Sequence, residues 1–81
     1  MAKKLVGVIH HYYPNISVAV VNLKGALKQG DTITIEGRNN FEQKVSSMQI
    51  DNKAIKEAKA KQSIGLKVNY EVKDKDKVYL L

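Results

Sequence analysis

The chain has 81 residues, with 14 Lys or Arg against 8 Asp or Glu, which gives a formal net charge of +6. A chain of this length buries only about two-thirds of its unfolded surface and holds one core, so we expect a single domain over residues 1–81. The absence of cysteine excludes disulfides and thiolate chemistry and favours a cytoplasmic location. No apolar run approaches the roughly 20 residues that cross a bilayer, so we expect no membrane contact.

Sequence patterning predicts six short strands. Residues 5–13 form the first, in which Gly7 indicates a bulge or a close backbone approach. Residues 16–23 form the second. They are apolar at nearly every position, so we expect both faces of this strand to be covered. Residues 32–36 form the third, because Ile alternates with Thr and Glu there.

The second half of the chain is less regular. Residues 41–50 alternate and then change phase, which predicts one extra bulged residue near Ser46 and Ser47. Residues 53–61 are good helix formers, but their apolar face is too small for a stable helix. We therefore expect a loop or a single turn that pins two apolar residues to the core, Ile55 and Ala58.

The last two strands are predicted at residues 63–72 and 77–81. The former alternates strictly, and Tyr70 shares a face with Ile64 and Leu66, so we expect Tyr70 in the core. Six strands without an amphipathic helix need a way to hide their edges. A closed or nearly closed antiparallel barrel provides it.

No catalytic constellation stands out. His10 and His11 are adjacent, and neighbours in a regular strand point to opposite faces, so they share a metal only if the backbone bulges there. The chain has no nucleophile-elbow motif and no phosphate-binding loop. We therefore expect no enzymatic activity, no metal and no cofactor.

The positive charge lies at the two ends of the chain, because residues 1–30 carry +4 and residues 61–81 carry 5 − 3 = +2. First and last strands often pair in antiparallel barrels, so we expect the ends to form a basic face that attracts polyanions, and we expect residues 53–61 to add a second cationic loop. The alternative is that the charge serves solubility alone. The phosphate contacts would come from Lys3, Lys4, Arg38, Lys53, Lys56, Lys59 and Lys61, with His11 and Tyr12 stacking on bases.

Several segments together resemble the second domain of translational GTPases such as elongation factor Tu. They are Val6-Gly7-Val8, residues 27–35 with Gly37, Val45, Ser47-Met48, Ile55, Ala58 and Ile64-Gly65-Leu66. Residues 12–21 and 47–50 are also similar to small standalone elongation-factor-like proteins and to the C-terminal barrel of collagenase-like peptidases. The resemblance implies an all-β fold, a small six-stranded antiparallel Greek-key barrel of the translation-factor domain 2 type. It also implies a structural turn at Gly30-Asp31, where glycine permits positive φ and aspartate favours a turn.

The chain also departs from that pattern. It has no GTPase domain, so we expect no nucleotide hydrolysis. Lys61-Gln62 and Lys75-Asp76 stand where the family has Gly-Asp. This leaves open whether the two turns keep the family's conformation.

Three functional hypotheses follow. The first is a non-catalytic module of translation-factor type that binds RNA or the ribosome through its basic surface. The second is a protein-interaction module, or an accessory subunit of a separately encoded enzyme such as a peptidase, with an apolar patch around Ile9, Tyr13 and Phe41. The third is an enzyme that uses His10 or His11, which requires a cleft beside them.

Overall fold

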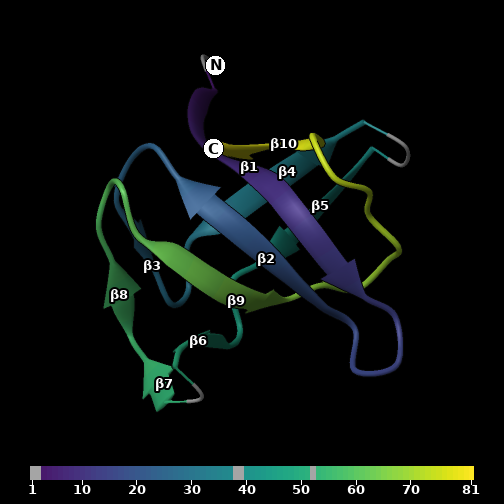
Figure 1. Cartoon of the computed structure of the whole chain (residues 1–81). Helices are drawn as coiled ribbons and strands as arrows, with labels where there is room; N and C mark the ends of the chain where they lie inside the picture. The colour runs from purple at the N-terminus through teal and green to yellow at the C-terminus, as the bar shows by residue number, and fades with distance from the viewer. Residues whose placement is uncertain (1–2, 38–39, 52) are drawn as a thin grey trace.

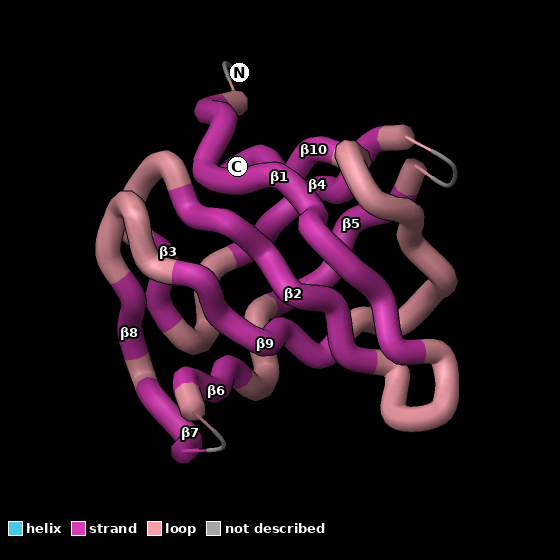
Figure 2. Tube along the Cα trace, viewed as in Figure 1, coloured by secondary structure: helices cyan, strands magenta, loops and turns pink. Residues whose placement is uncertain are grey.

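A computed structural model of the chain describes residues 3–37, 40–51 and 53–81 (Figure 1). Figure 2 shows strands joined by loops and no helix in these residues. None of the described segments is a helix long and apolar enough to cross a membrane. The strands are β1 (Lys4–Tyr13), β2 (Val18–Leu23), β3 (Leu27–Lys28), β4 (Thr32–Glu36), β5 (Phe41–Lys44), β6 (Met48–Ile50), β7 (Lys53–Ile55), β8 (Glu57–Ala58), β9 (Ser63–Lys67) and β10 (Lys77–Leu80).

Eight of the strands form one antiparallel sheet in the order β5-β4-β10-β1-β2-β9-β6-β7, and β3 pairs with β8 in a small second sheet. The large sheet curls into a half-barrel, and in the view of Figure 1 the strands β1, β2 and β9 lie in front of β4 and β5. The all-β, antiparallel prediction is confirmed. The prediction of six strands is wrong, because residues 41–50 contain two strands, residues 53–61 contain two where we expect a loop, and β3 lies outside the predicted segments. First and last strands do pair, β1 with β10.

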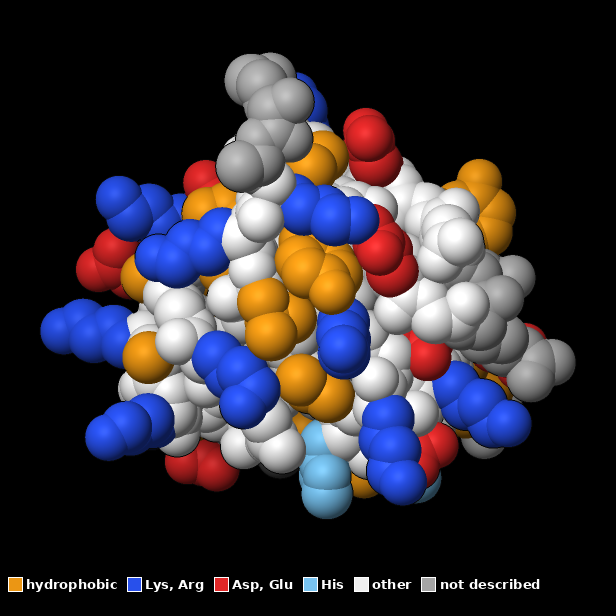
Figure 3. Space-filling view, turned by 90° about the horizontal axis from the view of Figure 1, so that it is seen from above, with side chains coloured by type: hydrophobic (Ala, Val, Ile, Leu, Met, Phe, Trp, Pro, Cys, Tyr) orange, Lys and Arg blue, Asp and Glu red, His pale blue; other side chains and the backbone are white. Residues whose placement is uncertain are grey.

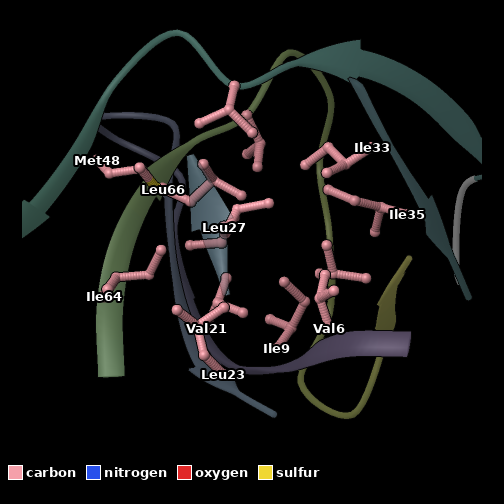
Figure 4. Close-up of a cluster of buried hydrophobic side chains, with 14 of the residues drawn as sticks. Val6, Ile9, Val21, Leu23, Leu27, Ile33, Ile35, Met48, Ile64 and Leu66 are labelled. Carbon is pink, nitrogen blue, oxygen red and sulfur yellow. The ribbon is translucent and has the colours of Figure 1, made fainter. Parts of the chain in front are cut away.

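The concave face of the sheet holds the hydrophobic core. Alternate residues of β1, β2, β4 and β9 point inward and meet there (Figure 4). Burying each large aliphatic side chain stabilises the fold by roughly 1.5–3 kcal/mol. The largest fully buried side chains are Ile9, Leu27, Ile33, Ile35, Met48, Ile64, Leu66, Val6, Val21, Val45 and Val78.

The bulge predicted at Gly7 is present. The register of β1 against β10 shifts between Leu5 and Gly7. A Cβ at position 7 would lie 2.6 Å from Cγ1 of Val21 and 3.1 Å from the carbonyl oxygen of Asn22. The glycine therefore allows β1 and β2 to approach closely.

The predicted bulge near Ser46 and Ser47 is wrong, because the chain breaks into two strands there. β5 pairs with β4, whereas β6 pairs with β9 and β7. Residue Val45, between them, stays buried and its N–H donates to the carbonyl of Asp31 at 2.8 Å. The change of phase in the sequence thus marks the point where the chain passes from one edge of the curled sheet to the other.

One buried side chain links β5, at one edge of the sheet, to the end of β9. Gln43 on β5 is 6% exposed. Its Nε2 donates to the carbonyl of Lys67 at 2.8 Å, and its Oε1 accepts the N–H of Asn69 at 2.8 Å. The amide of Gln43 therefore pairs with the backbone at the end of β9 as a neighbouring strand would.

The segment 53–61 forms neither a helix nor a plain loop. It contains the two short strands β7 and β8. Ala58 is buried and Ile55 packs against the core, so the expected anchoring of both residues is confirmed.

β9 ends at Lys67, five residues before the end predicted from its alternation. Val68 and Val72 remain buried, but Tyr70 is 60% exposed, so its placement in the core is wrong. The Tyr70 ring stands edge-on to Phe41, with ring centroids 4.9 Å apart. The reason is that the chain leaves the sheet after Lys67, where β2 has no further partner residues.

The turn at Gly30-Asp31 shows how this chain reverses direction. Gly30 has φ 94, and the N–H of Asp31 donates to the carbonyl of Lys28 at 3.1 Å. The Asp31 carboxylate in turn accepts the N–H of Lys28 at 2.9 Å. Its aspartate thus satisfies a backbone donor that the turn would leave open.

The same arrangement recurs in residues 59–62 and 73–76. The N–H of the first residue donates to the side-chain oxygen of the fourth at 2.7 and 2.9 Å. The third residues, Lys61 and Lys75, have φ 73 and 74. Both turns therefore keep the Gly30-type conformation without glycine, because Gln62 and Asp76 supply the side-chain acceptor.

Candidate binding site

A groove of about 730 Å³ crosses the outer face of the sheet, and we call it the β2–β9 groove. It spans the end of β1, the turn that follows, β2, β9 and β6. Its floor consists of Val18 and Val20 on β2 and Gly65 on β9, and its polar wall consists of Ser47, Gln49 and Asp51, on and beside β6. The lining residues are Tyr13, Ile16, Val18, Val20, Ser47, Gln49, Asp51, Gly65 and Lys67.

Strand register brings these residues together. Tyr13 lies opposite Val18, which lies opposite Lys67. In the next outward-facing row Val20 lies opposite Gly65, which lies opposite Gln49. Directly opposed residues on one face of an antiparallel pair have Cβ atoms about 4.5–5.5 Å apart, so each row forms a continuous surface.

Charge is balanced within the groove. Lys67 is its one cation, and its Nζ donates to the carbonyl of Ile16 at 3.1 Å. Asp51 supplies one carboxylate in the lining. Two amide or hydroxyl side chains, Gln49 and Ser47, add neutral donors and acceptors. The groove suits an uncharged apolar occupant that also makes a few hydrogen bonds.

A smaller hollow of about 430 Å³ adjoins the end of β1, lined by His10, His11 and Asp74 among others. The register of β1 against β2 shifts between Ile9 and His11, which is the bulge that the histidine pair requires to share a face. Within the described ranges, however, no group of three or more His, Cys, Asp or Glu residues could hold a metal ion. The hollow beside the histidines is present, but the described residues around it form no group that could bind a metal ion.

The predicted phosphate contacts do not gather in one place. Lys3 and Lys4 precede or begin β1, whereas the four lysines within 53–61 lie in the segment that contains β7 and β8, at the other side of the sheet (Figure 1). Four inter-strand steps separate β1 from β7. Seen from above, Lys side chains are spread among apolar and acidic ones (Figure 3). The described lysines of the predicted set therefore lie at two separate places in the sheet.

Individual members of that set differ in their surroundings. The ammonium of Lys3 pairs with the Glu36 carboxylate and lies 4.7 Å from the Tyr79 ring centroid. Tyr12 is half-buried and packs against the core. His11 is exposed and edge-on to Tyr13, with centroids 4.5 Å apart. Arg38 lies outside the described residues.

The predicted apolar patch is only partly where we placed it. Ile9 is 1% exposed, and Phe41 is partly buried against the core. Tyr13 is 47% exposed and belongs to the β2–β9 groove. The sequence signal for the groove is the apolar outward-facing half of β2; the prediction that both faces of this strand are covered is wrong, because Val18 and Val20 line the groove.

The chain is similar in sequence to one segment of a longer curated protein. No protein-family model matches the chain. A curated relative, an uncharacterized protease of Methanocaldococcus jannaschii, is 41% identical over 78 residues. The match covers 94% of this chain and 19% of that protease, so the chain spans about a fifth of its relative's length.

Two solved structures share the fold. One is the C-terminal domain of a Geobacillus thermoleovorans protein assigned as a U32 peptidase, with a TM-score of 0.89, 18% identity, and coverage of 96% of this chain and 92% of that one. The other is its selenomethionine variant, with a TM-score of 0.87, 19% identity, and coverage of 93% and 96%. The chain has the fold of that peptidase domain.

These findings correct the leading hypothesis. The resemblance to a peptidase-attached barrel is confirmed, whereas the proteins found are peptidases and not elongation factors. The assignment as a translation-factor module that binds RNA or the ribosome is therefore wrong.

Proposed function

We propose that this chain is a non-catalytic accessory module of a U32-type peptidase and binds the rest of that peptidase through a protein–protein contact. One observation carries the proposal. The curated relative matches 94% of this chain, yet the match covers only 19% of that protease. The chain thus corresponds to one folded segment of a larger protein, whose remaining length is available as its partner.

The groove's chemistry supports binding rather than catalysis. Its lining offers the hydroxyls of Tyr13 and Ser47, one carboxylate and one ammonium, and the ammonium donates to the carbonyl of Ile16. A nucleophile needs a base within hydrogen-bond reach to be activated. Apolar residues with a few polar neighbours are instead typical of a recognition surface.

Two further parts of the proposal rest on sequence. We propose that residues 1–81 act as a single domain, which agrees with one core. The lack of cysteine favours action in the reducing cytoplasm.

Complex formation tests the proposal. The purified chain is mixed with the Methanocaldococcus jannaschii protease from which the matched segment has been removed, and the mixture is examined by sedimentation velocity. We expect a faster boundary that contains both proteins in a 1:1 ratio. A small, unrelated protein of similar positive charge serves as the control. Separate sedimentation of the two chains, or an equal effect of the control, would overturn the proposal.

A further inference from the structure

β2 has apolar side chains on both of its faces, as a strand covered on both sides would have. The fold, however, covers only the face that points into the core. Ala19, Val21 and Leu23 point into the core and are buried. Val18 and Val20 point outward and are half-buried. In antiparallel sheets an outward face that meets water is normally polar. The valines of this face therefore indicate a surface that is covered in the working protein.

The neighbouring strand keeps that surface open. Gly65 lies in the middle of β9, opposite Val20, and its φ is outside the positive range that favours glycine. A Cβ built there would extend into the groove, 3.3 Å from Cγ1 of Val18 and 3.9 Å from the carbonyl oxygen of Gln49. Glycine inside a strand often marks a close approach of another backbone. The missing side chain of Gly65 therefore makes the groove deeper at this position.

Two large apolar side chains stand at one end of the groove. Ile16 is 57% exposed and Tyr13 is 47% exposed. Exposed aromatic and aliphatic residues beside a recess are typical anchors of protein–protein interfaces. They extend the apolar surface of Val18 and Val20 into the turn after β1.

Local charge narrows the class of occupant. The chain carries +6 overall, but the groove lining contains one Lys and one Asp. A polyanion would meet almost no net positive charge there. An extended polypeptide with apolar side chains would match the floor, while Ser47 and Gln49 at the wall can hydrogen-bond its backbone.

We propose that the β2–β9 groove receives an extended apolar segment of the peptidase to which this chain binds. The inference rests on the proposed function, since it names the surface and the kind of segment used. The volume of about 730 Å³ falls within the range of roughly 300–1,000 Å³ that is typical of binding pockets. The segment lies along β2 and β9, with Val20 and Gly65 beneath it.

Calorimetric titration of groove variants into the same truncated protease tests this inference. Val20→Lys places a charge on the floor, and we expect its Kd to rise at least about tenfold, as for a central interface residue. Ile16→Ser changes an exposed residue outside the strands, so folding is preserved, and its Kd should rise several-fold. Ala60→Lys is the matched control, because residue 60 is exposed and lies in the turn before β9. Its Kd should equal that of the unmodified chain.

The outcomes separate the two proposals. If the unmodified chain does not bind, both the proposed function and this inference are overturned. If it binds and both groove variants bind equally well, only the groove is overturned. If the chain alone sediments as a dimer that Val20→Lys disrupts, the occupant is a second copy of this chain, and the inference is overturned.

Discussion

Replacing Gln43 tests how the edge strand β5 is held to the backbone at the end of β9. Gln43 is 6% exposed, and its amide makes two hydrogen bonds of 2.8 Å to the backbone of Lys67 and Asn69. Each such bond contributes about 1 kcal/mol, and a buried group left without a partner costs about 1–3 kcal/mol. Gln43→Ala should therefore lower the free energy of unfolding by about 2 kcal/mol or more.

Urea denaturation followed by circular dichroism measures this change. With a slope of about 1 kcal/mol per M, the urea midpoint should fall by about 2 M. Thermal melting should fall by about 8–16 °C, because 1 kcal/mol corresponds to about 4–8 °C in a chain of this size.

Gln43→Met separates the hydrogen bonds from the packing, because methionine has a similar length and lacks both polar groups. We expect it to lose most of the stability that Gln43→Ala loses. If Gln43→Met is as stable as the unmodified chain, or if Gln43→Ala loses less than about 0.5 kcal/mol, a typical effect of an uninvolved site, the bridge is not holding the sheet and the reasoning fails.

Three further predictions concern turns and metal. Gly37→Ala should destabilise the fold by about 1–3 kcal/mol, as overpacking does, because its Cβ would lie 2.0 Å from Oδ1 of Asp76; an unchanged melting temperature would refute this. Lys61→Gly and Lys75→Gly should each stabilise the chain by about 0.5 kcal/mol, since relief of roughly 1 kcal/mol of left-handed strain exceeds the added chain entropy of about 0.5 kcal/mol; lower urea midpoints would contradict the turn assignment. Zinc should leave the melting temperature unchanged, because His10 and His11 belong to no metal-binding group among the described residues; a rise that grows with zinc concentration would show a site.

Local patterning predicted most strands because it reports which residues meet the core. The alternation of residues 32–36 gives β4 directly, and the glycine at position 7 gives the bulge in β1. The same patterning failed at Tyr70. Its neighbours Val68 and Val72 stay buried while the chain has already left the sheet, so alternation alone does not fix where pairing ends.

Tertiary contacts explain the other differences. The phase change after Val45 looks like a bulge in sequence, but its cause is that the chain crosses there between β5 and β6, which are neighbours in the chain and far apart in the sheet. The groove combines β1, β2, β6 and β9, and no local motif predicts such a combination. Net charge alone does not report position: Lys3 and Lys4 lie at the start of β1, whereas the lysines of residues 53–61 lie in the segment that contains β7 and β8.

The salt dependence of binding to the truncated Methanocaldococcus jannaschii protease tests the central claim most directly. A contact between apolar surfaces changes little between about 50 and 200 mM salt, whereas binding through many phosphate or carboxylate contacts weakens by orders of magnitude. The account predicts saturable binding whose Kd stays nearly constant over this range. Absence of saturable binding, or its collapse at the higher salt concentration, would contradict a peptidase-binding module that recognises its partner through an apolar groove.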